Sequence, residues 1–541
     1  MRNVGHRKHT KKQGKGGIAL GVALLSAAGI VVKIVGLLYK IPITHLLGDD
    51  GMGYFSGAYT VYLLFYSISA AGIPTALSIL VSRSEAVGNR RLTTHTDIVA
   101  TILFSSIGLV LSLILAIAAS PISSLVGNPQ ADLALLAIAP SVFFVCAAGA
   151  IRGFFQGHQV MLPTALSQIT EAIGKLLIGV FLANYAIKKG YAPERVAAFA
   201  ILGITVGSAC SMILLLFMRL RFCRRKRRTS DLFLDKNGKF VLPSMPSIVR
   251  EIVRIALPVT LSSAVVSLSG IVDLATVMHR LRDIGYSADV ANALYGNYSA
   301  LAVALVNMPI VLIAPISTGL VPYVSEAVER RDIGSVISTV DNSLTVTSMI
   351  AVPAAFGLAT LSKPILTLLF EDSAANTAAP LLSLLAPSLI FIALSNVSGS
   401  LLQAVDGVGV PLLSMSLGCA AKLVTSYSAI GKFGMAGTPV GTFVCYTVIA
   451  AVNFAFLSVK TRHLPPFSRL FLKPVLSGVI SSLSAAVAYK LAAPILGANG
   501  GLLIAIALAV VAYFAACVLL GSLREMGLRE MPLVRRSQAE Q

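Results

Sequence analysis

Residues 98–119 read IVATILFSSIGLVLSLILAIAA and include no charged side chain. A helix needs about 20 mostly apolar residues to cross the hydrocarbon core of a bilayer. The run lacks the regular alternation of polar and apolar residues that a membrane-spanning strand would show. This stretch therefore predicts a transmembrane helix.

Segments of the same kind recur along the whole chain of 541 residues. Candidate spans lie at residues 17–39, 53–82, 98–119, 132–152, 161–186, 196–218, 251–279, 294–325, 336–361, 378–403, 409–430, 435–458, 472–490 and 500–522. The first span follows a basic start and has no evident small-residue cleavage site, so we interpret it as an uncleaved helix. The sequence thus predicts an all-α polytopic membrane protein with about 14 transmembrane helices.

The composition supports a lipid environment for most of the chain. It is 56% hydrophobic and only 12% charged, whereas soluble domains carry charge on about a quarter of their residues. The net charge of +20 would be compatible with nucleic-acid binding, but the basic residues lie between the apolar runs. Their excess in alternate loops instead indicates orientation, with both termini in the cytoplasm. We expect a multi-pass protein of the cytoplasmic membrane that has no nucleic-acid partner.

A basic linker divides the chain into two halves. Its densest part runs from Arg219 to Arg228, and we interpret it as a topology anchor that contacts anionic lipids. The expected parts are a basic cytoplasmic N-terminus (1–16), an N-lobe of six spans (17–218), the linker (219–250), a C-lobe of six spans (251–458), two further spans (459–522) and a cytoplasmic tail (523–541).

Residues of the same type recur in the two halves at separations of 247 or 248 positions. The pairs are Gln156 with Gln403, Lys175 with Lys422, Pro163 with Pro411, and Pro74 with Pro322. Six spans separate equivalent positions, and an even number keeps the same orientation, so the repeats are parallel. Parallel repeats of transporters are related by an axis along the membrane normal and hold the substrate between them. The last two predicted spans fall outside the repeat.

Several ionisable residues fall inside or at the ends of predicted spans. They are Lys33, Glu171, Lys175, Asp273 and Lys422, with Arg152, Arg254 and Arg280 near span ends. Charged side chains within a membrane are costly and usually face an interior cavity. We therefore treat these residues as candidates for a substrate or ion pathway.

Each candidate also has a structural interpretation. Glu171 and Lys175 are four positions apart, so they share a helix face and could form an ion pair with each other. Lys33 and Lys422 have no acidic neighbour on their own helices, which favours a wet, substrate-facing position. The alternative is that they snorkel or pair with an acid on another helix. Asp273 could be that acid, or it could be a cation site.

Cationic groups outnumber acidic ones within the spans, which favours an anionic substrate. A diphosphate headgroup fits because Lys and Arg bind phosphate well, whereas an exporter of cationic drugs would need the opposite balance. A lipid tail on such a headgroup would need a groove, which the last two helices could supply.

Motifs for nucleotide, metal or covalent chemistry are missing from the sequence. There is no Gly-x-x-x-x-Gly-Lys-Ser/Thr loop for ATP, and the seven His and six Cys residues show no metal-ligand spacing. There is also no Gly-x-Ser-x-Gly nucleophile elbow. We expect no cofactor and no catalysis. Transport would draw its energy from the membrane potential, from a Na⁺ or H⁺ gradient, or from downhill consumption of the product.

Four segments together resemble a known family. They read Lys33-Ile-Val-Gly-Leu-Leu-Tyr-Lys-Ile-Pro42, Leu47-Gly-Asp-Asp-Gly-Met-Gly-Tyr54, Ala71-Gly-Ile-Pro74 and Arg152-Gly-Phe-Phe-Gln-Gly157. The chain resembles the polysaccharide biosynthesis branch of the multidrug/oligosaccharidyl-lipid/polysaccharide (MOP) exporters over nearly its whole length. Within that branch it is most similar to the stage V sporulation protein B type and its vegetative relatives, which are related to the MurJ-type lipid II flippases.

The resemblance implies two lobes around a V-shaped cavity that opens alternately to the two sides of the membrane. It also implies export of undecaprenyl-diphosphate-linked sugars, most plausibly lipid II, beside the wall-synthesis machinery. Lys33 aligns with a cavity arginine of the MurJ type. The chain departs from the MurJ type at three places. It has Tyr39-Lys40 where the MurJ type has Arg-Asp, and Tyr54 where the MurJ type has an Asp near the start of its second helix. Ser67 falls near the position of a later arginine in the second helix of the MurJ type.

The candidate site therefore comprises seven residues. For substrate binding they are Lys33, Lys40, Arg152, Glu171, Lys175 and Lys422, and for ion coupling Asp273. The alternatives to a lipid II flippase are a flippase for another lipid-linked polysaccharide repeat unit, a cation-coupled multidrug exporter, and a non-transporting membrane scaffold in wall or spore formation. A membrane glycosyltransferase would want an outer catalytic loop, and the outer loops here are short.

Overall fold

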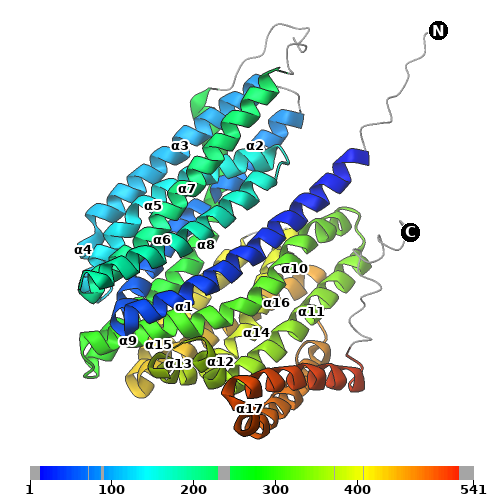
Figure 1. The fold of residues 1–541 in the computed structure, drawn as a ribbon. Coiled ribbons are helices and arrows are strands. Elements are labelled where there is room, and N and C mark those ends of the chain that lie inside the picture. Colours follow the sequence, from blue (N-terminus) through cyan, green and yellow to red (C-terminus); the bar gives the residue numbers. More distant parts are fainter. Residues whose placement is uncertain are drawn as a thin grey trace, which may run out of the picture. The chain divides into compact units, whose positions relative to one another are not determined.

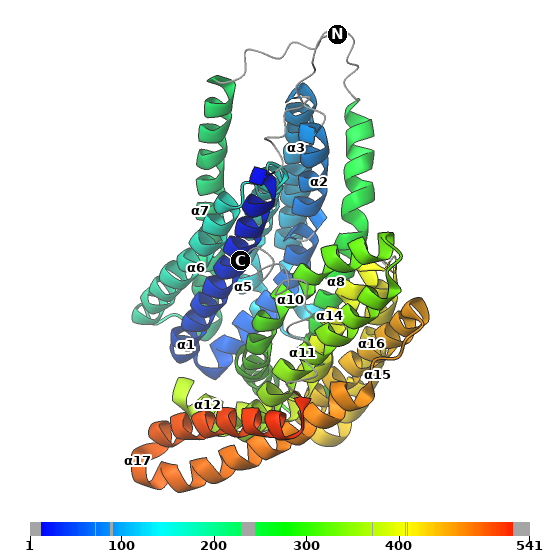
Figure 2. The same ribbon diagram turned by 90° about the vertical axis from the view of Figure 1, so that its right-hand side faces the viewer.

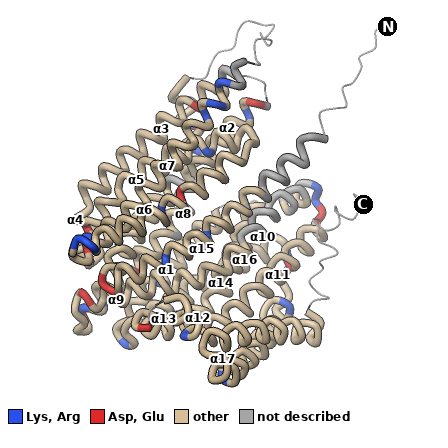
Figure 3. Tube along the Cα trace, viewed as in Figure 1, with Lys and Arg blue, Asp and Glu red and all other residues tan. Residues whose placement is uncertain are grey.

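The computed structural model describes residues 12–70, 72–86, 90–228, 244–370, 372–405, 407 and 409–522. These residues form helices joined by short turns, and they include no strand (Figure 1). Lys, Arg, Asp and Glu are sparse along the helices and lie mainly near their ends (Figure 3). The prediction of an all-α membrane protein is confirmed.

The chain divides into two compact units. The first comprises Met1–Leu46, Ala58–Ser124 and Pro129–Ser267, and the second comprises Leu47–Gly57, Leu125–Asn128 and Leu268–Gln541. The boundary crosses two long helices, α1 and α8. The two short inserts of the second unit are the part of α1 around the Gly48 break and the turn that follows α4.

The first unit is built from the N-terminal helices. They are α1 (Lys12–Ala70, apart from residues 47–57), α2 (Gly72–Ala86), α3 (Arg90–Ile117), α4 (Ala119–Leu125), α5 (Asp132–Gly157), α6 (Leu162–Lys188), α7 (Pro193–Arg228) and the first part of α8 (Met245–Asp283).

The second unit holds the remaining helices. They are the end of α8, α9 (Ala288–Asn297), α10 (Val303–Glu329), α11 (Ile333–Thr360), α12 (Ser362–Leu369), α13 (Asp372–Leu385), α14 (Ser388–Ala404), α15 (Val410–Phe433), α16 (Gly437–Thr461) and α17 (Lys473–Leu519).

Two of these helices are interrupted by a glycine. Gly48 in α1 has φ 62° and ψ −172°, and Gly497 in α17 has φ 76° and ψ 168°. Glycine adopts positive φ without the steric cost that a side chain would bring. Each long helix is therefore two helices joined at a glycine, and the halves of α17 fold back on each other (Figure 2). The Ser481 hydroxyl donates to the carbonyl of Ala509 across that hairpin, at 2.8 Å.

Ten helical segments of the described chain are long and apolar enough to cross a membrane, or eleven when the bent pair α13 and α14 is counted as one span. Three of the ten exceed 50 residues, which is more than one bilayer crossing requires. Each of these three covers two of the spans predicted from the sequence, and all fourteen predictions overlap described helices. The structure is thus consistent with the predicted number of fourteen.

The predicted boundary between the N-lobe and the linker, after residue 218, falls inside helix α7. Helix α7 continues to Arg228, so the basic residues 219–228 are helical and continuous with the sixth predicted span. Residues 229–243, 1–11 and 523–541 lie outside the described residues, and they include 15 of the 32 residues of the predicted linker and the whole predicted tail.

Helices α6 and α7 pack together through glycines. A Cβ atom added to Gly203 of α7 would lie 2.3 Å from the Cα of Gly179 on α6, and one added to Gly207 would lie 2.7 Å from the Glu171 carbonyl oxygen. Small residues let membrane helices approach closely when lipid provides no hydrophobic driving force. This close contact fixes the position of α6, which carries two of the candidate site residues, Glu171 and Lys175.

Candidate functional site

Arg152 is the centre of a buried polar cluster in the first unit. Arg152 is 6% exposed, and its side chain extends from α5 toward α6 and α7. Its Nη2 atom lies 2.8 Å from Glu171 Oε2 and donates to the Ser211 hydroxyl at 3.0 Å. Its Nε atom donates to the Ser167 hydroxyl at 2.9 Å. The charge of Arg152 is therefore balanced by Glu171 inside the unit.

Glu171 does not form the ion pair with Lys175 that their spacing allowed. Within the described residues, the carboxylate pairs with Arg152 instead. The Lys175 ammonium lies 4.7 Å from the ring centre of Tyr39 and 4.7 Å from that of Tyr59. Aromatic faces attract a cation through their quadrupole without neutralising its charge. The positive charge of Lys175 is thus held over two aromatic rings, and the Glu171 carboxylate, although paired with Arg152, also attracts it.

Lys33 and Lys40 lie on α1, on the same side of the Gly48 break as Tyr39. The charge of Lys175 repels both of them, and the charge of Lys33 repels Lys40. The structure therefore brings three of the predicted lysines into one electrostatic cluster, although they come from two helices more than 120 positions apart in sequence. Lys33 is exposed and Lys175 half-buried. We call Lys33, Lys40 and Lys175 the lysine cluster.

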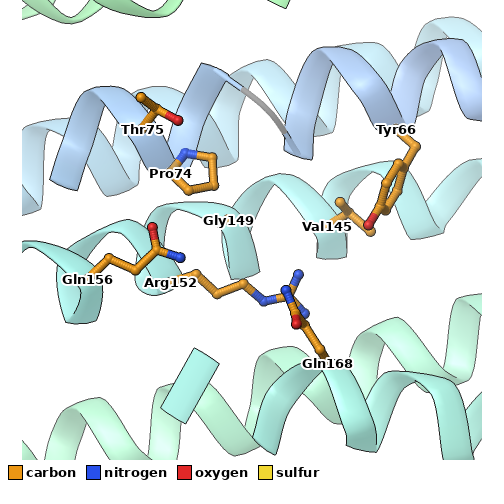
Figure 4. A pocket seen from close by; sticks show the side chains of 8 residues that line it. All are labelled: Tyr66, Pro74, Thr75, Val145, Gly149, Arg152, Gln156 and Gln168. Carbon is orange, nitrogen blue, oxygen red and sulfur yellow. The ribbon is translucent and has the colours of Figure 1, made fainter. Parts of the chain in front are cut away.

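A polar pocket of about 210 Å³ lies beside Arg152 in the same unit (Figure 4). Its lining comprises Tyr66, Pro74, Thr75, Val145, Gly149, Arg152, Gln156 and Gln168. The side chains come from the second half of α1 and from α2, α5 and α6. Polar groups from four separate helices therefore meet at one site.

A row of tyrosines links the pocket to the lysine cluster. Tyr59, Tyr62 and Tyr66 are spaced at i, i+3 and i+7 along α1, and neighbouring rings lie 5.9 Å and 5.7 Å apart. Tyr59 contacts Lys175, and Tyr66 lines the pocket. The sequence analysis missed this row. The helical spacing of the three tyrosines was the signal that could have found it.

Lys422 and Asp273 form a buried ion pair in the second unit. Lys422 Nζ lies 2.7 Å from Asp273 Oδ2 and donates to the Ser269 hydroxyl at 3.0 Å. Lys422 is 3% exposed and Asp273 is 7% exposed. The structure thus shows the arrangement that the sequence left open, in which Lys422 of α15 pairs with an acid on another helix, α8. Asp273 Oδ1 is buried and has no hydrogen-bond partner among the described residues.

The arginines near span ends take part in other contacts. The Arg280 guanidinium lies 4.5 Å from the Tyr427 ring centre and 3.4 Å from Asp283 Oδ2. Arg219, which the sequence analysis placed in the linker, pairs with the buried Asp97 and donates to Thr101. The contacts of Arg280 with Tyr427 and of Arg219 with Asp97 join neighbouring helices within each unit, whereas Asp283 lies on the same helix as Arg280. They give a structural reason for the charges.

None of the described residues forms a group of three or more His, Cys, Asp or Glu that could hold a metal ion. The polar clusters instead combine lysine, arginine, tyrosine and amide side chains. Such groups bind anions and hydrogen-bonding ligands rather than metal ions.

The described residues combine an all-helical polytopic fold with buried cationic groups, and solved structures of membrane transporters share this fold. The structure is similar to that of "Lipid II flippase MurJ, inward closed conformation", with a TM-score of 0.70 and 16% identity, over 92% of this chain and 98% of that one. It is also similar to the inward-facing conformation of a multidrug resistance MATE family transporter, with a TM-score of 0.63 and 12% identity, over 81% of this chain and 94% of that one.

The chain belongs to the family described as "Polysaccharide biosynthesis protein", whose sequence profile matches residues 18–328. Three relatives from Bacillus subtilis (strain 168) are similar to it. They are the uncharacterized membrane protein YabM (25% identity, 81% of this chain and 80% of the relative), stage V sporulation protein B (24%, 85% and 88%) and the lipid II flippase MurJ (22%, 88% and 88%). The family expected from the N-terminal motifs is confirmed.

Proposed function

We propose that this protein is a flippase for an undecaprenyl-diphosphate-linked precursor, with lipid II as the first candidate substrate. It would carry the headgroup from the cytoplasmic to the outer leaflet of the cytoplasmic membrane by alternating access, with both of its termini in the cytoplasm. The observation that carries the proposal is the lysine cluster. Three cationic side chains gather in one unit, while the nearby carboxylate of Glu171 is paired with Arg152.

The charge of this cluster suits a diphosphate better than a neutral or cationic ligand. Lysine ammonium groups bind phosphate oxygens through short, charge-assisted hydrogen bonds. The like charges of Lys33, Lys40 and Lys175 repel one another, and a bound anion would relieve that repulsion. A cationic drug would instead increase it, so the cation-coupled multidrug exporter is the weaker proposal.

The relatives support the same substrate class. One of them is named as a lipid II flippase and another as a stage V sporulation protein, and the family is described by polysaccharide biosynthesis. A flippase for another lipid-linked polysaccharide repeat unit therefore remains the second proposal. The substrates in the two proposals differ only in the glycan that is attached to a shared polyprenyl-diphosphate anchor.

A panel of lipids in proteoliposomes tests the proposal. Purified full-length protein is reconstituted with lipid II, with polyprenyl diphosphates carrying other glycans, and with a phospholipid of equal charge. Flipping is read from the access of a membrane-impermeant reagent to the headgroup. We expect faster flipping of a polyprenyl-diphosphate glycan than of the phospholipid. Equal rates for all lipids, with protein shown to be folded, would instead support a non-transporting scaffold in wall or spore formation.

We further propose that transport is driven by the membrane potential or by a Na⁺ or H⁺ gradient, with Asp273 as the coupling residue. The supporting observation is Asp273 Oδ1, which lies beside the Lys422 ammonium and has no hydrogen-bond partner in the part of the chain that the structure describes. Imposing each gradient separately across the same proteoliposomes tests this. A flipping rate that responds to none of them would contradict the coupling.

A further inference from the structure

The pocket beside Arg152 contains several polar side-chain groups that have no hydrogen-bond partner among the described residues. The hydroxyl of Tyr66 and the side-chain amides of Gln156 and Gln168 form no hydrogen bond with any described residue. Figure 4 shows Arg152 of α5 and Gln168 of α6 extending toward each other, with Tyr66 approaching from α1. Each amide offers two N–H donors and an acceptor oxygen, and the hydroxyl offers both functions.

Arg152 also keeps part of its donor capacity. A guanidinium carries five N–H donors, and three of them serve Glu171, Ser167 and Ser211 through Nε and Nη2. The Nη1 group has no hydrogen-bond partner in the described part of the chain, and Arg152 lines the pocket. Its charge, however, is already balanced by Glu171 at 2.8 Å. The pocket therefore offers directed donors without a net positive charge.

These groups define the chemistry of a ligand. An anion would gain little from a balanced Arg152–Glu171 pair and would be repelled by the Glu171 carboxylate. An uncharged group with several hydroxyl or amide oxygens would instead satisfy the amides, the tyrosine hydroxyl and Arg152 Nη1 together. The volume of about 210 Å³ is below the range of about 300–1,000 Å³ typical of drug-sized ligands. It suits a single small ring with polar substituents.

The pocket and the lysine cluster share one face of α6. Gln168, Glu171 and Lys175 follow one another at i, i+3 and i+7, so all three lie on the same side of the helix. At 1.5 Å per residue, Gln168 lies about 10 Å from Lys175 along the helix axis. A headgroup whose diphosphate contacts Lys175 could thus extend along the tyrosine row and place a sugar near Gln168.

We propose that the pocket formed by Tyr66, Arg152, Gln156 and Gln168 is the subsite for the uncharged glycan of the lipid-linked substrate, separate from the lysine cluster that binds its diphosphate. This inference rests on the proposed function and refines it. It assigns recognition of the sugar to neutral hydrogen bonds and recognition of the lipid anchor to charge. Gln156 and Gln168 then determine which glycan the protein prefers.

Binding to lipids with and without a glycan tests the assignment. The full chain in detergent is titrated with polyprenyl diphosphate and with lipid II, and compared with Gln156→Leu, Gln168→Leu and the double variant. We expect the double variant to bind lipid II about tenfold more weakly, which corresponds to 1.4 kcal/mol, and to bind polyprenyl diphosphate with unchanged affinity. Lys33→Gln should weaken the binding of both lipids.

Gln403→Leu is the matched control because Gln403 occupies the equivalent position in the second half of the sequence and is exposed. Equal weakening of both lipids in the glutamine variants, or no change for either, would overturn the proposal. If the wild-type chain binds neither lipid, the proposed function fails, and a free N-acetylated aminosugar becomes the probe. Its binding to the wild type and not to the double variant would uphold the pocket as a glycan site. If the free aminosugar does not bind the wild type, the pocket is not a glycan site.

Discussion

Lys422 Nζ lies 2.7 Å from Asp273 Oδ2, whereas Lys175, its counterpart 247 positions earlier, lies over two tyrosine rings at 4.7 Å. The two lysines occupy equivalent places in the sequence repeat but different electrostatic surroundings. In the second unit the positive charge is cancelled by a carboxylate. In the first unit it is kept beside two further lysines. We infer that the two halves have diverged in role, with anion binding assigned to the first unit.

We predict that Lys33→Gln and Lys175→Gln each lower the rate of lipid II flipping by at least about tenfold. The reason is the loss of a charge-assisted contact with the diphosphate, worth about 1.5–3 kcal/mol for a hydrogen bond to a charged group. Initial rates in proteoliposomes and complementation of a flippase-depleted strain measure the effect. The control is Lys188→Gln, an exposed lysine in the last turn of α6. Wild-type rates in both cluster variants would exclude the lysine cluster as the substrate site.

Glu171→Gln tests the ion pair at the pocket. Removing one partner of a buried pair leaves an uncompensated charge, which costs about 3–5 kcal/mol. We therefore predict a clear loss of thermal stability for Glu171→Gln in detergent. Glu251→Gln is the comparison, because Glu251 pairs with Arg83 at 3.2 Å on an exposed surface, and exposed pairs contribute only about 0–1 kcal/mol. Similar melting temperatures for the two variants would mean that the Arg152–Glu171 pair stabilises the protein no more than the exposed pair does.

The sequence predicted the helical membrane fold because every span must satisfy its own backbone hydrogen bonds, and long apolar runs can do so only as helices. It also selected Lys33, Lys175 and Asp273 as candidates, because a charge is conspicuous inside an apolar run. It could not decide which charges pair. Glu171 had a lysine four positions away, yet it contacts an arginine nineteen positions earlier. Partners on different helices depend on helix rotation, which periodicity alone does not fix.

The same limit explains why the pocket was missed. Gln156 and Gln168 are unremarkable in sequence, and neither amide is costly enough in a span to attract notice. Gln156 was noted for its recurrence at Gln403 and as part of the family-like segment Arg152 to Gly157. Its proximity to Tyr66 and Gln168 follows from the packing of α1, α5 and α6, which composition and spacing do not determine.

The glycine contact between α6 and α7 leads to a stability prediction. A side chain at Gly203 would collide with the Gly179 backbone, where even a Cβ would approach to 2.3 Å. We predict that Gly203→Leu separates the two helices and lowers both thermal stability and expression. Gly190→Leu is unsuitable as a comparison because its φ is +72°. Gly357→Leu, in a helix with open space around the added atom, should be tolerated. Normal stability of Gly203→Leu would show that α6 and α7 are not closely packed in the membrane.

A double-mutant cycle at Asp273 and Lys422 separates a structural role from a transport role. Asp273→Asn and Lys422→Gln each leave one buried charge without its partner, so we predict that each single variant loses stability on the order of 3 kcal/mol. The double variant removes both charges and keeps polar groups of similar size, so its stability should recover most of the loss. Melting curves in detergent measure this step.

Flipping by the recovered double variant then decides the role of the pair. If the double variant flips substrate at the wild-type rate and responds to the same gradient, the pair only joins α8 to α15. If it is folded but no longer responds to an imposed gradient, the Asp273 carboxylate is needed for coupling, because an amide cannot exchange a proton or neutralise a cation.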